Sequence, residues 1–506
     1  MKHRRTPPAA LALVAALALV AAPAYAHPPR PTDPNQPLRD GCQRSDFGVG
    51  FNSSPQWVYV YRNPAIRKAA GIARVTHPTR DDSVLQHRWY DFNANLQPDA
   101  PYRYLVAGTR HPPRNNFASK DEEFARLHFE WEERTLPYFA WPTDGDRVTL
   151  WGSWIWDCGH WTSVENNSGG QVTGEHSELH PLNAIVVHRR APYRPSRRAT
   201  ETDFFMSSNG NGAHAVEKCA LSHHPASSTA YDPGFTPCAE NPRNRIQPLE
   251  RRYSFFVPAP PRPSSAARLR FRVIRRVARA ATERIAARPN GLAVTVTPRR
   301  GARDVRYGTT YRVWWSGRDV RPPTALRVTL KSILVRQADP QPENPDPTPP
   351  PWTLYMNVNG YWKLLDDWAP RLYGVHDGER IPINRSVRIN VPQGAGLWFQ
   401  VDGRECDEPS GTTLFGITAG LVRPCPANRD EINPNVLDLL MNDDTGTVLD
   451  VYPSAAAALG THVRTSKATV RWPHTGRISL GNGKQGAGDY VLRYRITRIR
   501  PARFTG

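Results

Sequence analysis

The sequence predicts a mainly β, multi-domain protein, with a small curled sheet or barrel followed by β-sandwich-like domains. The chain has 506 residues, which is about three times the length of an average domain. Its 50 prolines and 35 glycines indicate many turns and few long helices. Many short segments also alternate between apolar and polar residues, which is the pattern of half-buried strands.

Residues 1–26 have the pattern of a secretory signal peptide. Basic residues at positions 2–5 precede an apolar run over 9–22 and a small-residue cleavage site, Ala24-Tyr25-Ala26. The run is too short and too rich in alanine for a good membrane span, and no comparable run follows. We therefore expect a secreted protein, extracellular or periplasmic, that has no transmembrane segment after cleavage and begins with a Pro-rich leader over 27–40.

Six cysteines in a chain that is expected to be exported predict disulfide bonds, because exported proteins fold in an oxidising environment. Many pairings of six cysteines exist, and the sequence leaves the choice among them open. Bridges between sequence neighbours are the simplest arrangement, and they leave the first two cysteines to each other. The expected bridges are Cys42–Cys158, Cys219–Cys238 and Cys406–Cys425.

The formal net charge is +20, from 66 Lys and Arg residues against 46 Asp and Glu residues. This charge is spread along the chain, which favours a general role in solubility. The alternative interpretation is attraction to an extracellular polymer or polyanion, such as nucleic acid, an anionic cell-wall polymer or a membrane surface.

Residues 41–190 are expected to form the first domain, which is rich in strands. Its strand segments alternate in polarity or are rich in aromatic and β-branched residues. Turn-forming residues over 143–146 and 166–170 separate the last three segments. The expected strands are 57–61, 87–99, 127–132, 147–156 and 175–187.

A Pro/Arg-rich linker over 191–201 leads to a second β-rich domain over 202–318. Within that domain, 270–288 is compatible with a basic amphipathic helix in its second half, but a strand followed by an Arg-rich loop is the preferred interpretation. Alternating segments over 319–506 predict a C-terminal β-sandwich, and Asn359-Gly360 between two of them is a strong hairpin signal.

The densest group of acid–base and metal-ligand side chains occupies the last two strands of the first domain. A DCGH segment supplies Asp157 and His160, and an HSELH segment supplies His176, Glu178 and His180. Strand side chains repeat every two residues, so the second three would leave the same face of a sheet. The first two would lie one loop away.

Two imidazoles and nearby carboxylates can hold a divalent ion, such as Zn²⁺ or Mg²⁺, and leave one position open for water. We expect His180 and His160 to be ligands, with Asp157 as a ligand or an orienting group and His176 at the periphery. Glu178 is expected to be the general base or the third ligand, and His160 is the second catalytic candidate. Metal-free acid–base catalysis and plain cross-strand hydrogen bonding stay open as alternatives. Supporting candidates on neighbouring strands are Glu130 and Asp91.

Acidic residues in two loops of the C-terminal domain could line a Ca²⁺ site, because Ca²⁺ prefers oxygen ligands. A hydrated acidic loop without a metal is the preferred interpretation. The residues are Asp339, Glu343 and Asp346 in one loop, and Asp402, Glu405 and Asp407 in the other.

Four motifs resemble the signature of a family of uncharacterised exported bacterial proteins, which runs EWE, GDRV, DCGH and (T/S)E(I/L)HP. The resemblance covers the first domain well and the later domains loosely. It implies export and brings no established activity. The matching residues are Glu130-Trp131-Glu132, Gly145-Asp146-Arg147-Val148, Asp157-Cys158-Gly159-His160 and Glu178-Leu179-His180-Pro181.

The DCGH segment is also similar to the DRGH motif of non-specific ββα-metal endonucleases. That resemblance implies His160 as the general base and Asn183 or Asn166 as the residue that holds Mg²⁺. Cys158 stands where the motif has arginine, which removes a phosphate-binding charge, and the helix that should follow is not evident.

Together these patterns predict a divalent-metal-assisted hydrolytic site in the N-terminal domain, with a phosphodiester or polysaccharide substrate. The alternative is a non-catalytic extracellular protein that binds a polymer or glycan, for which 15 tryptophans and 18 tyrosines offer stacking surfaces. A DRGH-like nuclease is the weaker alternative.

Overall fold

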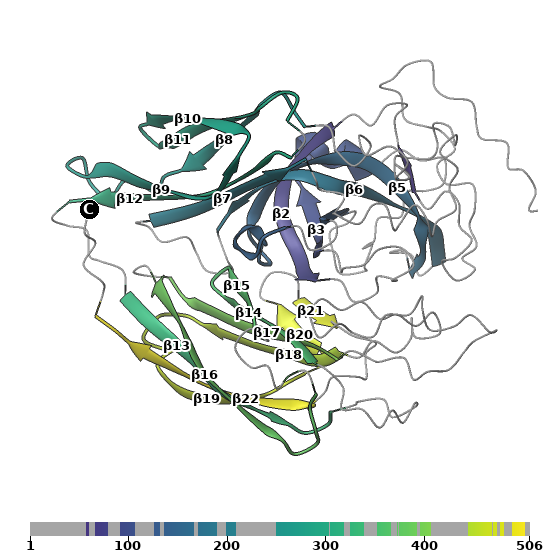
Figure 1. The fold of residues 1–506 in the computed structure, drawn as a ribbon, viewed down its shortest axis with the longest axis vertical. Helices are drawn as coiled ribbons and strands as arrows, with labels where there is room; N and C mark the ends of the chain where they lie inside the picture. The colour runs from purple at the N-terminus through teal and green to yellow at the C-terminus, as the bar shows by residue number, and fades with distance from the viewer. Residues whose placement is uncertain are drawn as a thin grey trace, which may run out of the picture.

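The computed structural model of the chain is almost entirely β, and the prediction of a mainly β, multi-domain fold is confirmed. Among the described residues the strands, which Figure 1 labels, are accompanied by two short 3-10 helices, η1 (Ala100–Val106) and η3 (Tyr138–Ala140). The structure describes residues 57–59, 66–78, 92–106, 126–131, 136–165, 171–189, 199–208, 249–302, 304–317, 324–338, 352–365, 372, 374–391, 395–405, 444–467, 469–472, 476–479 and 488–500.

Five strands close into a small barrel. Their order is β2-β3-β4-β6-β5, and β5 returns to pair with β2. All pairs are antiparallel except β4 with β6. This is the five-stranded Greek-key arrangement of OB-fold barrels, which by itself implies no activity. The strands are β2 (Ile66–Pro78), β3 (Phe92–Pro98), β4 (Leu127–Trp131), β5 (Arg147–Glu165) and β6 (Gln171–His188); the three-residue β1 (Trp57–Tyr59) pairs with β5 outside the barrel.

Alternation along the strands fills the barrel with apolar side chains. On β4, Leu127, Phe129 and Trp131 are fully buried in the core, so the residues between them point to the other face. Gly71 lies where β2 comes close to β3: a Cβ atom there would be only 2.0 Å from the carbonyl oxygen of Gln97. The small barrel therefore requires glycine at this position.

The sheet continues beyond β6 into a second layer. The strands β7 (Ala199–Ser207), β12 (Arg306–Ser316) and β9 (Arg268–Arg279) extend it, so the predicted linker over 191–201 falls between two hydrogen-bonded neighbours. A three-stranded sheet shares an apolar core with this extension. It consists of β8 (Tyr253–Pro258), β11 (Gly291–Pro298) and β10 (Ala281–Arg288).

The segment 270–288 forms two strands, β9 and β10, with Ala280 at φ 56° between them. The preferred prediction of a strand is confirmed for the first part. The Arg-rich loop expected for the second part is wrong, and so is the alternative helix. A contact with a distant segment explains this difference. β10 is hydrogen-bonded along its whole length to β11, a largely buried strand, and this pairing holds β10 in the extended conformation.

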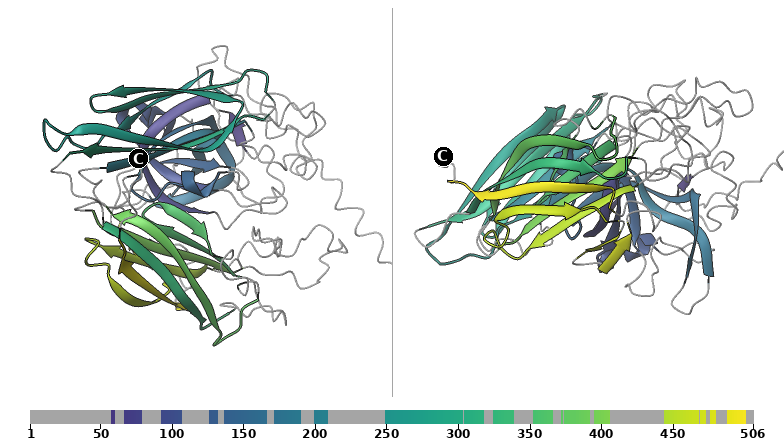
Figure 2. Two further views of the ribbon diagram at one scale, coloured as in Figure 1. Left: turned by 60° about the vertical axis from the view of Figure 1, so that its left-hand side comes forward. Right: turned by 90° about the horizontal axis from the view of Figure 1, so that it is seen from below.

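The C-terminal residues form a sandwich of two four-stranded sheets, which lies below the other sheets in the left view of Figure 2. The turn at Asn359-Gly360 has positive φ at both residues, 51° and 85°, so the predicted hairpin is confirmed. One sheet is β16 (Arg380–Val391), β13 (Thr324–Val335), β22 (Tyr490–Arg498) and β19 (Gly460–Thr465). The other is β15 (Tyr361–Leu364), β14 (Trp352–Val358), β17 (Leu397–Glu405) and β18 (Asp444–Tyr452), and β20 (Thr469–Trp472) pairs separately with β21 (Gly476–Ser479).

The β14–β15 hairpin joins the sandwich to the barrel. Trp362 packs in the barrel core at 5.5 Å from Trp141, measured between ring centroids, and its indole donates a hydrogen bond to the carbonyl of Pro142. Asn357 donates a hydrogen bond of 3.0 Å to the hydroxyl of Thr143. The two units therefore share buried apolar and polar contacts.

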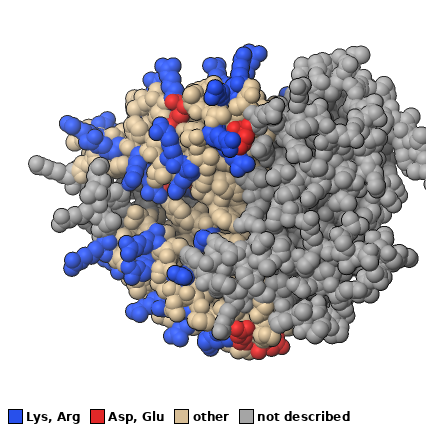
Figure 3. All heavy atoms as spheres, viewed as in Figure 1, with Lys and Arg blue, Asp and Glu red and all other residues tan. Residues whose placement is uncertain are grey.

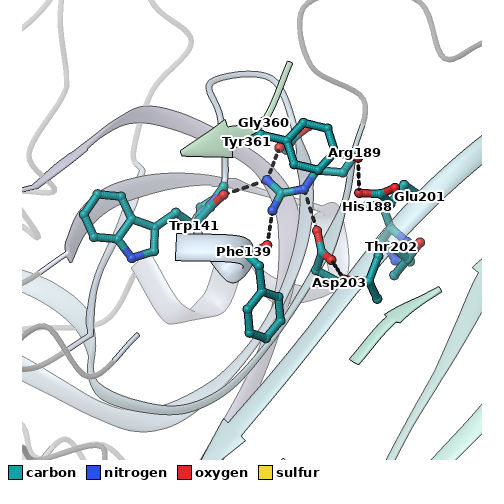
Figure 4. A network of polar contacts seen from close by, with 12 residues as sticks. Phe139, Trp141, His188, Arg189, Glu201, Thr202, Asp203, Gly360 and Tyr361 are labelled. Carbon is teal, nitrogen blue, oxygen red and sulfur yellow. Dashed lines mark hydrogen bonds and ion pairs between the residues drawn. The ribbon is translucent and has the colours of Figure 1, made fainter. Parts of the chain in front are cut away.

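Arg189, at the end of β6, is the buried centre of this junction (Figure 4). Its guanidinium donates to Asp203 at 2.7 Å, to Asp146 at 3.2 Å, and to the backbone carbonyls of Trp141 and Phe139. Burial lowers the pKa of Arg189, but the two carboxylates raise it further, so the net shift is upward. Burial raises the pKa of Asp203 to about 6, although Arg189 works against that shift.

Several predictions concern residues outside the described ones. They are the signal peptide over 1–26, the leader over 27–40, the six cysteine side chains and the acidic residues 339, 343, 346 and 407. Among the residues that the structure does describe, there is no helix with the length and apolar character needed to span a membrane.

Candidate metal centre

The parallel pairing of β4 with β6 brings two pairs of polar side chains together. His128 lies beside Glu178 in the register, and Phe129 lies beside Leu179. Phe129 and Leu179 belong to the barrel core. Because side chains alternate along a strand, the neighbouring polar residues leave the opposite, outer face of the barrel. Those residues are His128 and Glu130 on β4, and Glu178 and His180 on β6.

Three of these residues form a compact group that could hold a metal ion. Glu130, Glu178 and His180 each offer one ligand atom, and these atoms all lie within 4.8 Å of one another. The Nδ1 atom of His180 is 3.2 Å from Oε2 of Glu130 and 3.6 Å from Oε2 of Glu178. Their side chains are only 8%, 11% and 3% exposed, for His180, Glu130 and Glu178 respectively. The group is thus buried as well as compact.

His128 extends the group on its far side. Its Nε2 atom is 2.9 Å from the second carboxylate oxygen of Glu130, and its Nδ1 atom is 3.1 Å from Oδ1 of Asn95 on β3. This imidazole therefore fixes the orientation of Glu130, as an outer-shell partner does for a metal-binding carboxylate.

Two adjacent buried carboxylates cost free energy unless a positive charge or a shared proton lies between them. A divalent cation bound by Glu130, Glu178 and a neutral His180 supplies that charge. Protonation of His180 and His128 supplies it as well, because each imidazolium would donate to a carboxylate oxygen at the observed distances. The geometry is compatible with both states, which differ in whether metal binds.

The structure brings together Glu178 and His180 from the predicted site, and it adds Glu130, which the sequence suggested only as a supporting residue. The register of β5 and β6 places Asp157 opposite His176, and His160 lies in β5 within an irregular stretch before Thr162. The structure does not describe the side chains of Asp157, His160 and His176, and it does not describe Asp91. Their predicted roles stay predictions.

His128 is the residue that the sequence prediction missed. The clean alternation over 127–132 already placed His128 and Glu130 on one face of a strand. What the sequence could not supply was the partner strand, because β4 and β6 are separated by about 40 residues and by β5. The pairing depends on barrel closure.

Two residues of the other predicted sites, Asn183 and Asp402, have structural partners. Asn183, which the endonuclease resemblance assigned to Mg²⁺, accepts a hydrogen bond of 3.1 Å from the hydroxyl of Tyr253. Asn166 lies outside the described residues. Asp402, one of the expected Ca²⁺ ligands, is fully buried within β17 and accepts hydrogen bonds from Gln400 and Thr447.

Comparison with other proteins identifies no family. No protein-family model matches the chain, and no curated sequence matches it. Two solved structures of extended-synaptotagmin 2 align weakly: one holds its two C2 domains, A and B, and the other holds the SMP domain together with both C2 domains. Their TM-scores are 0.17 and 0.18, with 8% sequence identity each; they cover 86% and 89% of this chain and 91% of each of those chains. Likeness at this level supports no conclusion about fold or function.

Proposed function

We propose that the barrel of this exported protein binds a divalent cation through Glu130, Glu178 and His180 and that the bound ion supports hydrolysis. The observation that carries the proposal is the compact, buried group of two carboxylates and one imidazole on the outer face of β4 and β6. Its two carboxylates balance the charge of a divalent ion.

The spacing of the group suits Zn²⁺. Bonds of about 2.1 Å at tetrahedral angles place ligand atoms about 3.4 Å apart. The distances from Nδ1 of His180 to the two carboxylates, 3.2 and 3.6 Å, lie on either side of that value. An imidazole ligand favours Zn²⁺ over Mg²⁺, which prefers oxygen ligands and retains most of its water.

Three protein ligands leave one position for water, and Zn²⁺ lowers the pKa of bound water to about 7. In this assignment Glu178 is the third ligand rather than the general base. His128 orients Glu130 through the 2.9 Å contact of its Nε2 atom. His160, expected from the sequence as a ligand and as the second catalytic candidate, takes the role of general base in this proposal, with Asp157 as its orienting group and His176 at the periphery. A phosphodiester and a polysaccharide are the two substrate classes that the sequence leaves open.

The burial of the group favours a second candidate function. Only 3% of the Glu178 side chain is exposed, which is typical of a structural ion rather than of one that meets a substrate. With a structural ion the protein would be a non-catalytic binder of an extracellular polymer or glycan. The DRGH-like nuclease would use His160 and a separate Mg²⁺ site.

Metal content decides the first part of the proposal. The purified protein should contain close to one equivalent of zinc, and after chelation added Zn²⁺ should raise its thermal midpoint. A concentration of 100 times Kd would stabilise the barrel by about 2.7 kcal/mol, or roughly 5 to 10 °C. Glu178→Gln and His180→Ala should abolish both effects.

A matched control is His188→Ala, because His188 lies on the same strand and bonds to Thr202 instead of the group. It should retain the zinc and the thermal shift. If the wild-type protein holds no zinc and shows no shift, the imidazolium state is correct and the proposal is wrong.

The reaction is tested separately with a chromogenic phosphodiester, by release of reducing sugar from polysaccharides, and with plasmid DNA in Mg²⁺. Turnover that disappears in Glu178→Gln, and survives in His188→Ala, would support zinc-dependent hydrolysis. Zinc binding without turnover would support the structural ion. Plasmid cleavage that needs Mg²⁺ and His160, but not His180, would support the nuclease.

A further inference from the structure

The outer sheet of the C-terminal sandwich is strongly basic. Its four strands, β16, β13, β22 and β19, contain no Asp or Glu. On β16, β13 and β22 alternate residues fill the sandwich core, so the residues between them form the outward face. Figure 3 shows Lys and Arg over the described surface of both the upper sheets and the sandwich below them, with fewer acidic side chains. The cationic residues are Arg380, Arg385 and Arg388 on β16, Arg327 and Lys331 on β13, Arg493, Arg495 and Arg498 on β22, and Arg464 on β19.

Strand register makes four of these arginines direct neighbours, and we call Arg327, Arg388, Arg493 and Arg495 the basic face. Arg327 lies directly opposite Arg388. Directly opposed residues have Cβ atoms about 5 Å apart, and diagonal neighbours such as Arg327 and Arg495 are about 7 to 8 Å apart. Arg493 and Arg495 alternate along one strand, about 7 Å apart. The four charges therefore lie on three adjacent strands, each next to another arginine in register, on the diagonal or along its own strand.

The basic face has no internal counter-charge. Within the described part of the chain, none of its four guanidiniums makes an ion pair or a side-chain hydrogen bond, whereas arginines elsewhere have carboxylate partners: Arg464 with Asp450, Arg312 with Glu201, and Arg279 and Arg306 with Asp304. Like charges directly opposite each other destabilise a sheet. A surface arranged in this way is stabilised when an anion lies across it.

The residues between the arginines favour an anion that carries hydroxyl groups over a single-stranded nucleic acid or a lipid surface. Thr329 lies opposite Ser386 and Arg495, and Thr461 also lies opposite Arg495, so hydroxyl groups occupy the positions beside the guanidiniums. The outward positions of these four described strands include no aromatic side chain, although single-stranded nucleic acids are held by stacking on aromatic rings. Val463 is the one exposed large apolar side chain on these four strands, and Leu334 and Val491 are only partly exposed, which is too little to insert into a lipid interface.

We propose that the basic face binds a linear anionic polysaccharide, whose carboxylate or sulfate groups pair with Arg327, Arg388, Arg493 and Arg495. Arginine forks suit such planar or tetrahedral anions. The hydroxyls of Thr329 and Ser386 bond to each other at 2.8 Å, which leaves one donor and further acceptor positions for sugar hydroxyls. The site lies on the sandwich and uses no residue of the metal centre. Binding therefore does not depend on the proposed hydrolytic function, and it should persist in EDTA.

The test measures binding of the full-length protein, in EDTA, to polygalacturonate, heparin, neutral dextran, double-stranded DNA and vesicles of phosphatidylcholine with phosphatidylglycerol. The wild-type protein should bind polygalacturonate or heparin, should release it as salt rises, and should not bind dextran. The triple variant R327A/R388A/R495A should bind at least tenfold more weakly. The matched control is R268A/R270A/R272A, which removes the same charge from exposed arginines of β9 and should bind within threefold of wild type.

A second variant keeps the test independent of folding. Arg388→Glu places a carboxylate opposite Arg327, so it should leave the thermal midpoint unchanged or raise it, and it should still weaken glycan binding at least tenfold. If the control variant R268A/R270A/R272A lost as much glycan affinity as R327A/R388A/R495A, net charge alone would explain the binding, and the proposal would be overturned. Failure of the wild-type protein to bind either glycan would also overturn it, as would tighter binding to DNA or to vesicles than to both.

Discussion

Replacing Arg189 by methionine should severely destabilise the junction between the barrel and the sandwich. Methionine retains most of the side-chain volume and removes the charge. It leaves Asp203 and Asp146, whose side chains are 3% and 0% exposed, without their shared cation. It also removes the donors to the carbonyls of Trp141 and Phe139. Breaking a buried ion pair in this way costs about 3 to 5 kcal/mol.

The conservative variant Arg189→Lys should cost less, about 2 kcal/mol. Lysine keeps the charge but places it on one nitrogen, so it cannot reach Asp203, Asp146 and two carbonyls from different sides. Gly360 provides the room for the guanidinium, since a Cβ atom there would come within 3.1 to 3.4 Å of the Arg189 side chain. The exposed Arg284→Met on β10 serves as the control and should change stability by less than about 0.5 kcal/mol.

The loss of stability in Arg189→Met should increase with pH. The pKa of Asp203 is about 6 in the folded protein, above its usual value, so its contribution to stability is greatest in acid and is lost as pH rises to about 6. Removing Arg189 removes the cation that opposes this shift, so the pKa should rise further. The deficit of Arg189→Met should therefore be larger at pH 8 than at pH 5, and Asp203→Asn should remove most of that difference.

Urea unfolding followed by tryptophan fluorescence, at pH 5 and pH 8, measures these effects. Transition midpoints are compared among variants, because a multi-domain chain need not unfold in two states. The reasoning is refuted if Arg189→Met lies within about 1 kcal/mol of Arg284→Met, or if its deficit shrinks as pH rises.

Two further predictions concern the barrel. Gly71→Ala should destabilise the barrel by more than about 3 kcal/mol, because the new Cβ atom would overlap the Gln97 carbonyl. The control Gly301→Ala, at φ 73° with open space around it, should cost about 1 kcal/mol. Comparable thermal midpoints for the two variants would contradict the close approach at Gly71. His128→Ala should weaken zinc binding by about 10- to 100-fold in a chelator competition without abolishing it, because His128 orients Glu130. Unchanged affinity would show that it plays no such role.

Local patterns were sufficient for much of the fold. Alternation predicted the mainly β class, and it predicted that HSELH lies on a strand with Glu178 and His180 on one face. Asn359-Gly360 predicted its hairpin, because few residues adopt positive φ at two successive positions. These features depend on neighbours in the chain, which is why the sequence alone carries them. The strand β10 was not predicted, because its short, arginine-rich sequence is stabilised by pairing with β11.

What only the tertiary structure decided is which strands lie next to each other. Alternation assigns a side chain to a face but does not name the residue opposite. Glu130 therefore joins Glu178 and His180 only because barrel closure pairs β4 with β6. Arg327 and Arg388 oppose each other only because β13 pairs with β16 in one particular register. Arg189 lies in an Arg-rich stretch of the sequence, and only the folded structure places it between Asp146 and Asp203, with Gly360 of the docked hairpin against its side chain. Contacts between distant segments are set by the packing of the whole core, and no short window of sequence contains that information.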